Sequence, residues 1–549
     1  MHERFLEIIE NSIQTNWNKP ALTDLEGKTY LYKDFAQKIK EMHLLFDTMN
    51  IQQGDRIAIC GKNSSHWAVA FFATLSYGAV VVTILHDFHA ESIVDIVNHS
   101  EANVFFMDYA TKNKVAPSSV PGVNHLISLD DFSVIYTTNK QAEAASANFG
   151  QLFAEKYPSG VQPEALGFFV ESPEELAVLN YTSGTMSSPK GVMLPYRSLW
   201  SNTRFAIDNI DFVRPGDNII CMLPMAHMYG LAFEILLNIS KGCHIHFLTK
   251  TPSPGVLIKA FADVKPSLVL AVPLIIEKIV TSRVFPELEK QPAKTLLKLP
   301  FLKNIVHKKV NDTLIRTFGN QMKELVIGGA ALNNEVGEFL TKIKFPYTVG
   351  YGMTECGPLI SYIYWDKYKP GSCGKAVDRM EVKIDSSDPQ QVVGEILVKG
   401  VNVMLGYYKN EEATKNVFTK DGWLRTGDLA TIDKDGLIFI KGRNKSMILG
   451  ANGQNIYPEE IEEKFNNEKY VLEALVVERG HKLEVLIVPD REALDKDRIE
   501  KNSYPDIFGK VLAAVNNRLP GFSKVVNFEL RENEFEKTPK RSIRRFLYK

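Results

Sequence analysis

Short apolar runs alternate with helical patterns along the first two-thirds of the chain. Arg56–Cys60 predicts a strand, the following SHWAVAFFATLSYG a buried helix, and AVVVTI a second buried strand, which together indicate a β-α-β unit. Further apolar strands are predicted at 103–107, 218–223, 243–248, 267–271 and 324–327. Strands that alternate with helices favour a mostly parallel, doubly wound sheet, or two such sheets.

The pattern changes after about residue 375. MEVKID, GEILVKG and GLIFIKG are short alternating strands between Gly, Asp and Asn turns, so we expect a small antiparallel β unit there. Beyond the charged joint KGRNK, the order strand, helix, strand, strand, helix, strand predicts a compact α+β unit. The predicted fold class is therefore α/β. A large N-terminal lobe (1–441) holds the doubly wound subdomains and the β unit, a hinge follows (442–445), and a small mobile α+β lobe ends the chain (446–549).

One apolar stretch resembles a membrane span in hydropathy alone. It runs over residues 67–85, but Thr74, Ser76 and Gly78 interrupt it, and its pattern changes from helix to strand midway. We therefore predict a buried helix and strand here, and no integral membrane span.

Composition narrows the classes of function. The chain has 549 residues, with 64 Lys and Arg against 65 Asp and Glu, so no global charge favours nucleic acid as a partner. Its five cysteines form no CxxC pair, which fits a reducing compartment without a Cys-based zinc site. The first residues lack the long apolar run of a secretory signal. We expect a cytoplasmic protein, and a transient association with a membrane surface stays open.

The segment with the most chemical information is YTSGTMSSPKG, residues 181–191. It follows an apolar strand, and its hydroxyls, free backbone N–H groups and Lys190 suit a polyphosphate. A flexible surface loop is the alternative for this segment alone. Other Gly-containing loops follow strands or joints, where open α/β sheets bind ligands. They are PMAHMYG (224–230), IGGAAL (327–332), TVGYGMTECGP (348–358), WLRTGDL (423–429) and GRNKSMILGANGQNIYPEEIE (442–462).

These segments, in this order, resemble the core motifs of the adenylate-forming (AMP-binding) superfamily, which includes acyl-CoA synthetases, nonribosomal adenylation domains and beetle luciferases. The resemblance covers nearly the whole chain. It implies that Tyr351 and Gly352 lie at adenine, that Thr354 contacts the α-phosphate, and that Glu355, with Thr185, holds Mg²⁺. It also implies that His227 lies at the edge of the acyl pocket.

The resemblance assigns the remaining residues to the nucleotide and to the hinge. It places Thr182, Ser183, Gly184, Thr185 and Lys190 at the phosphates, Gly329 and Ala330 against nucleotide and acyl group, Asp428 and Arg443 at the ribose, Lys445 at the hinge, and residues 450–455 along the thiol channel. Taken singly, Asp428 also suits a turn, Arg443 and Lys445 a solvated charge cluster, and His227 a hydrogen-bonded core histidine.

The sequence departs from the family pattern in two places. Met186 and Ser187 replace the usual Thr-Gly of the phosphate loop. In the C-terminal motif FEKTPKRSIRRFLYK, Ser542 stands where the family has a lysine that neutralises carboxylate and α-phosphate, and a hydroxyl carries no fixed charge. Lys540, two residues earlier, faces the same side if the segment is a strand, so we predict that Lys540 takes this role. Arg541 in a loop and a merely basic surface at this tail are the alternatives.

The predicted function is an ATP-dependent acid–thiol ligase that forms acyl-AMP and then a coenzyme A thioester. ATP, Mg²⁺, the acid and coenzyme A are the implied ligands. The length of MILGANGQNIYPEE resembles the long-chain group, which favours a medium- or long-chain fatty acid and a role in lipid metabolism. Two alternatives stay open: a ligase that loads a carrier protein, and a nucleotide- or acyl-binding regulatory protein without catalysis. The sequence leaves the oligomeric state and the pathway open.

Overall fold

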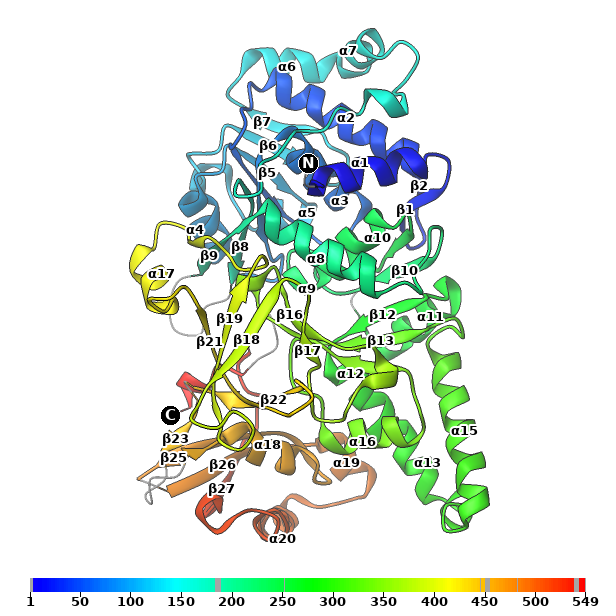
Figure 1. Ribbon diagram of the computed structural model, residues 1–549, viewed down its shortest axis with the longest axis vertical. Helices are drawn as coiled ribbons and strands as arrows, with labels where there is room; N and C mark the ends of the chain where they lie inside the picture. Colours follow the sequence, from blue (N-terminus) through cyan, green and yellow to red (C-terminus); the bar gives the residue numbers. More distant parts are fainter. Residues whose placement is uncertain are drawn as a thin grey trace. The chain divides into compact units, whose positions relative to one another are not determined.

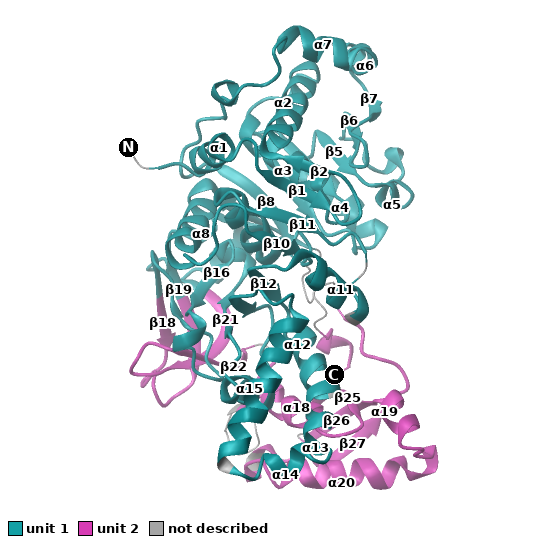
Figure 2. Ribbon diagram, turned by 90° about the vertical axis from the view of Figure 1, so that its right-hand side faces the viewer, with its two compact units in different colours: residues 1–182, 188–381, 398–424 teal, residues 183–187, 382–397, 425–549 magenta. Residues whose placement is uncertain are grey.

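The computed structural model describes residues 3–182, 189–250, 252–444, 446–449, 455–480, 482–537 and 543–548. The chain divides into two compact units (Figure 2). Unit 1 comprises residues 1–182, 188–381 and 398–424, and unit 2 comprises residues 183–187, 382–397 and 425–549. The predicted hinge at 442–445 stays a prediction.

The main sheet of unit 1 has eight strands, five of which form a parallel centre. Its order is β20 (Gly406–Tyr407), β9 (Lys190–Pro195), β8 (Leu176–Thr182), β4 (Val80–Ile84), β3 (Arg56–Cys60), β5 (Val104–Met107), β6 (His125–Ser128) and β7 (Val134–Thr137). Strands β8 to β6 in this order run parallel, whereas β9, β20 and β7 add antiparallel edges. The predicted β-α-β unit is thus confirmed.

Helix α3 (Ser65–Tyr77) explains the apolar stretch at 67–85. The Ser64 hydroxyl accepts a hydrogen bond from the backbone N–H of Trp67 at the start of the helix, and Gly78 (φ 91°) ends it. The helix packs against β3 and β4 of the main sheet, against β1 (Pro20–Asp24) and against α2 (Tyr32–Thr48). It is therefore apolar on nearly every side because it is buried on nearly every side. No described helix is long and apolar enough to cross a membrane.

Two further sheets of unit 1 contain the other predicted apolar strands. One has the order β10 (Asn218–Cys221), β11 (His244–Phe247), β1 and β2 (Thr29–Leu31), and the other consists of parallel β12 (Leu268–Ala271), β13 (Glu324–Ile327) and β14 (Tyr347–Val349). A small antiparallel sheet joins β15 (Tyr351–Gly352), β16 (Leu359–Tyr362) and β17 (Lys375–Ala376). The longer remaining helices of unit 1 are α1 (Phe5–Thr15), α4 (Ala90–Ser100), α6 (Lys140–Ala147), α7 (Phe149–Lys156), α8 (Tyr196–Asn209), α11 (Pro254–Val264), α15 (Pro300–Thr317) and α16 (Asn334–Lys342) (Figure 1).

The predicted β unit is present as a sheet of β18 (Met380–Asp385), β19 (Gly394–Gly400), β21 (Leu424–Ile432) and β22 (Ile438–Arg443), in which β21 and β22 pair antiparallel. The predicted α+β portion of unit 2 is also confirmed. Its sheet pairs β25 (Val471–Arg479) antiparallel with β26 (Lys482–Pro489), and β26 parallel with β27 (Asn527–Leu530). Helices α18 (Pro458–Asn466) and α20 (Tyr504–Asn516) cover the sheet with a core that contains Phe465 and Phe508.

Candidate active site

The phosphate-loop motif begins and ends at two strands that pair with each other. Thr182 ends β8, Lys190 begins β9, and the two residues are register partners in the antiparallel pair. The backbone of both therefore lies at the carboxyl end of β8, next to the parallel centre of the sheet. Ser183, Gly184 and Thr185, which the motif also places at the phosphates, lie outside the described residues.

A chain of contacts in unit 1 joins Lys190 to Glu355. The ammonium group of Lys190 lies 5.0 Å from the ring centroid of Tyr407, a cation–π distance. The Tyr407 hydroxyl donates a hydrogen bond to Glu355 Oε1 at 2.8 Å. Burial, followed by the Glu355 charge, raises the pKa of Tyr407, so its hydroxyl stays a donor at neutral pH. The predicted phosphate lysine and the predicted magnesium carboxylate thus lie on either side of one tyrosine.

Sequence reasoning missed Tyr407. It lies in β20, which pairs with β9 through Tyr407 and Val192, more than two hundred residues apart in the chain. The only local signal is the segment LGYYKN (405–410), in which Tyr407 and Tyr408 follow a glycine. Such a segment by itself is typical of a turn. Its role depends on a strand pairing that the local pattern does not determine.

The loop that carries Thr354 is built to a tight backbone geometry. A side chain at Gly352 would put its Cβ 2.2 Å from the carbonyl oxygen of Pro358, so only glycine fits there. Thr354 is buried and begins a single 3₁₀ turn, Thr354–Cys356. The buried side chain of Asn202 on α8 donates to the Cys356 carbonyl at 3.2 Å and accepts from the Leu359 backbone N–H at 2.9 Å. Helix α8 therefore fixes the far side of this loop.

Two other predicted loops of unit 1 meet at Tyr229. The Tyr229 hydroxyl donates to the Val326 carbonyl at 3.0 Å, and a Cβ at Gly328 would lie 3.0 Å from the Tyr229 ring. The structure thus brings PMAHMYG and IGGAAL together at the ends of their strands. Gly329 next to it has φ +85° and is exposed, as is Ala330, so this backbone is open to a ligand.

His227 begins a short helix beside these loops. Its Nδ1 accepts the backbone N–H of Tyr229 at 3.2 Å. The carbonyl of the preceding Ala226 accepts from Asn180 Nδ2 at 2.8 Å, and Asn180 belongs to β8. His227 is therefore held in place close to the end of β8. Its assignment to the acyl pocket stays a prediction, as does that of Tyr351, which is half-buried in β15.

Unit 2 contains the predicted ribose pair. Asp428 on β21 and Arg443 on β22 are register partners, and Arg443 Nε lies 3.2 Å from Asp428 Oδ1. The carboxylate is nearly buried, with 12% of its side chain exposed, whereas Arg443 is 67% exposed. The ion pair holds Asp428 on a strand and leaves Arg443 accessible. Asp428 is therefore not a simple turn residue, and Arg443 is not an unpaired surface charge.

The C-terminal motif forms a narrow hairpin in unit 2. Lys537 and Ile543 are bridge partners, and the Arg544 backbone N–H donates to the Glu536 carbonyl at 2.8 Å. Lys537 itself is paired with Glu473 at 2.5 Å and with Glu534 at 2.8 Å. Lys540 and Ser542, which lie between these bridge partners in the sequence, are outside the described residues, and Lys445 of the predicted hinge is outside them as well.

Glu462 and Arg545 anchor this hairpin to α18. Arg545 Nη1 donates to Glu462 Oε1 at 2.7 Å, and its other terminal nitrogen contacts Oε2. Burial raises the pKa of Glu462 in spite of the arginine charge. A buried carboxylate destabilises the folded state unless a cation pairs with it. Glu462 therefore holds Arg545 in place, and Arg545 in turn fixes the base of the hairpin.

A family model described as "AMP-binding enzyme" matches residues 9–408, and a model of the "AMP-binding enzyme C-terminal domain" matches residues 445–548. The chain therefore belongs to the AMP-binding enzyme family and is an adenylate-forming acid–thiol ligase. The resemblance inferred from the motifs is thereby confirmed, as is the two-lobe α/β fold class.

The proteins that this chain resembles are named for different acids. The chain is 27% identical to long-chain-fatty-acid–CoA ligase FadD15 of Mycobacterium bovis, with 93% of this chain and 88% of the relative covered. It is 26% identical to a long-chain-fatty-acid–CoA ligase of Escherichia coli, with 97% and 94% covered. Among solved structures, ATP-bound MatB from Rhodopseudomonas palustris has a TM-score of 0.77 at 22% identity (98% of each chain), and a benzoate CoA ligase from Burkholderia xenovorans has 0.78 at 18% (100% and 99%).

Tyr407→Phe should lower the rate of acid-dependent ATP–pyrophosphate exchange about tenfold to a hundredfold, because a hydrogen bond to a charged group is lost while the ring under Lys190 is kept. The Mg²⁺ concentration that gives half of the maximal rate should rise as well. Tyr408→Phe is the matched control, since the Tyr408 hydroxyl contacts exposed Glu101 instead. Equal rates in both variants would remove Tyr407 from the site.

Proposed function

We propose that the protein activates a medium- or long-chain fatty acid with ATP and transfers the acyl group to coenzyme A. The observation that carries this proposal is the contact chain Lys190–Tyr407–Glu355 at the carboxyl end of β8. It joins the phosphate-loop motif to the predicted metal carboxylate within one unit, as expected of a nucleotide site.

The residues present suit one Mg²⁺ ion. Glu355 is half-buried, and the hydrogen bond from Tyr407 engages its Oε1. Among the described residues no group of three or more His, Cys, Asp or Glu side chains could hold a metal. This is compatible with Mg²⁺, which is typically bound by one or two carboxylates plus substrate phosphates and water. When bound, the ion would neutralise charge on the phosphates as pyrophosphate leaves.

The first half-reaction joins two anions. A carboxylate oxygen of the fatty acid attacks the α-phosphorus of ATP, the bond to the β-phosphate oxygen breaks, and acyl-AMP and pyrophosphate form. Since both partners are negative, the protein must orient them and offset their charge. Thr354 would donate to the α-phosphate, Lys190 would neutralise the leaving phosphates, and Asp428 with Arg443 would hold the ribose.

In the second half-reaction the sulfur of the thiol attacks the acyl carbon and AMP leaves. The proposed acceptor is coenzyme A. Residues 450–455 would line its path to the site, and of these 450–454 lie outside the described residues. The choice of a long acyl chain is supported by relatives named long-chain-fatty-acid–CoA ligases at 26–27% identity. Because a benzoate CoA ligase is among the proteins of similar fold, aryl acids are the first alternative substrates to compare with fatty acids.

The acid specificity is tested by acid-dependent ATP–pyrophosphate exchange over saturated acids of increasing chain length, with benzoate and malonate as the aryl and short dicarboxylic comparisons. Exchange should be fastest with a medium or long chain. The acceptor is tested by offering acyl-AMP to coenzyme A and to a phosphopantetheinylated carrier protein. Preference for the carrier protein would select the first alternative function, and nucleotide binding without exchange for any acid would select the regulatory one.

Lys445→Pro should separate the two half-reactions. Proline fixes φ and removes a backbone donor, so a hinge at this position could no longer change conformation. Acyl-AMP formation should persist, whereas thioester formation should fall at least tenfold, a gating effect of the kind seen for hinge positions. Both are measured in single turnovers, started from ATP and from acyl-AMP, with Lys445→Ala as the control. Equal loss of both steps in a folded variant would argue against the hinge.

A further inference from the structure

The segment that leads into α15 and most of the helix itself carry charge of one sign. Residues 290–311, KQPAKTLLKLPFLKNIVHKKVN, contain six lysines and no aspartate or glutamate. The whole chain is nearly neutral, with a net charge of −1. This segment of unit 1 is therefore strongly positive, although the net charge of the whole chain does not reveal it.

Helix α15 presents two large apolar side chains to solvent. Leu314 on its inner side is 2% exposed, whereas Phe301 and Ile305, one turn apart, are 89% and 63% exposed. Leu299, just before the helix, is 48% exposed. Within unit 1, α15 packs against α11 and α14 (Ala293–Leu296) (Figure 1). Single exposed apolar residues are ordinary, but three that gather at one helix end mark a binding surface.

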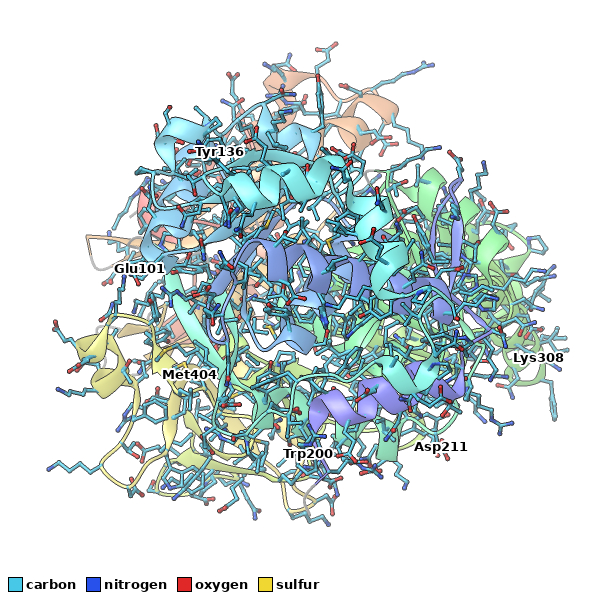
Figure 3. The ribbon with its side chains drawn as sticks, turned by 90° about the horizontal axis from the view of Figure 1, so that it is seen from above. Glu101, Tyr136, Trp200, Asp211, Lys308 and Met404 are labelled. Carbon is cyan, nitrogen blue, oxygen red and sulfur yellow. The ribbon has the colours of Figure 1, made fainter. Side chains whose placement is uncertain are left out.

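Three of the lysines lie close to these apolar side chains. Lys308 and Lys309 follow Phe301 by seven and eight residues and so share its side of the helix, and Lys298 directly precedes Leu299. All three are exposed, and Lys308 lies at the rim of the view in Figure 3. None of the three takes part in an ion pair with another described residue, whereas Lys290 at the start of the segment contacts Glu287. The three charges are thus available to an anionic partner.

We propose that this surface, which comprises Leu299, Phe301, Ile305, Lys298, Lys308 and Lys309 and is called here the α15 surface, docks the protein on an anionic lipid bilayer. Phe301 and Ile305 enter the boundary between headgroups and acyl chains, and the lysines contact lipid phosphates while their stems stay on the apolar side. The charge complementarity favours this occupant over a second copy of the chain, whose own α15 surface would be equally positive.

This docking rests on the proposed function. A long-chain fatty acid partitions into bilayers, so an enzyme that activates it meets its substrate at the membrane surface. Docking would bring the enzyme to its substrate without a membrane span.

Co-sedimentation with vesicles tests the α15 surface directly. The wild-type chain should bind phosphatidylcholine vesicles that contain phosphatidylglycerol, bind pure phosphatidylcholine far less, and lose affinity as salt is raised. The triple variant K298E/K308E/K309E should bind on the order of a hundredfold more weakly, and F301S/I305S on the order of tenfold. The control K420E/K434E/K496E makes the same change of charge at exposed lysines elsewhere and should bind like wild type.

Insertion is tested by an environment-sensitive dye at position 304. Asn304 is exposed one residue from Ile305, and all five native cysteines are buried, so Asn304→Cys can be labelled selectively. Emission of the dye should shift to the blue with anionic vesicles and stay unchanged with neutral ones. No shift with anionic vesicles would overturn insertion at this surface.

Activity on a water-soluble, medium-chain acid separates this inference from the proposed function. The K298E/K308E/K309E variant should exchange pyrophosphate with that acid at the wild-type rate, yet use long-chain acid presented in anionic vesicles several-fold more slowly. Binding of wild type to neither vesicle, or equal binding by all variants, would overturn the docking proposal with the ligase intact. Self-association that F301S/I305S abolishes, without vesicle binding, would also overturn it, in favour of a second copy.

Discussion

Glu355→Gln should lower acid-dependent ATP–pyrophosphate exchange at least about a hundredfold, the effect of removing one group that stabilises charge in the transition state. Glutamine keeps the size of the side chain and can still accept the Tyr407 hydroxyl hydrogen bond through its amide oxygen. It lacks the negative charge that a divalent cation requires. The loss should therefore concern the cation and leave the loop in place.

The charge-matched control is Glu101→Gln. Glu101 also accepts a tyrosine hydroxyl, from Tyr408 at 3.1 Å, but it is more than half exposed and carries no predicted catalytic role. Its exchange rate should stay within about twofold of wild type, as for most exposed surface changes. Exchange by Glu355→Gln at the wild-type rate would show that Glu355 is not the Mg²⁺ residue.

Lys540→Ala should depress acyl-AMP formation on the order of a hundredfold or more, because the first half-reaction needs a cation beside the carboxylate and the α-phosphate and Ser542 cannot supply one. Thioester formation from pre-made acyl-AMP should be spared, because the rotation that we predict for the small lobe would by then turn another of its faces to the site. Single-turnover assays that start from ATP or from acyl-AMP separate the two effects.

Two further variants interpret the result. Lys537→Ala removes a lysine three residues earlier in the sequence that is already paired with Glu473 and Glu534, so it should leave adenylation nearly unchanged. Ser542→Lys should leave the rate unchanged or raise it. No loss in Lys540→Ala with a gain in Ser542→Lys would describe a slow adenylating enzyme that mainly uses an activated acid. No adenylation in any of these variants, with nucleotide still bound, would favour a regulatory protein.

Local pattern was sufficient for the elements of the fold and for the loops of the site. The apolar runs at β3, β4, β5, β12 and β13 predicted strands because a strand buried on both faces needs apolar side chains throughout. The glycine-rich loops after β8, β10 and β13 were recognisable because tight turns and close ligand approach demand small or polar residues in short stretches. These are short-range requirements, so the sequence records them directly.

The order of the strands and the partners of the site residues required the tertiary structure. Apolar runs alone do not reveal which strands share a sheet, and the structure distributes them among three sheets. Tyr407 reaches Lys190 and Glu355 only because β20 adds to the edge of β9, and Asn202 supports the Thr354 loop only because α8 packs beside it. Such contacts join residues far apart in the chain, and they depend on packing and register that no local pattern specifies. The sequence by itself therefore determined the family, the motifs and the elements, whereas the tertiary structure decided which side chains hold the motifs in place.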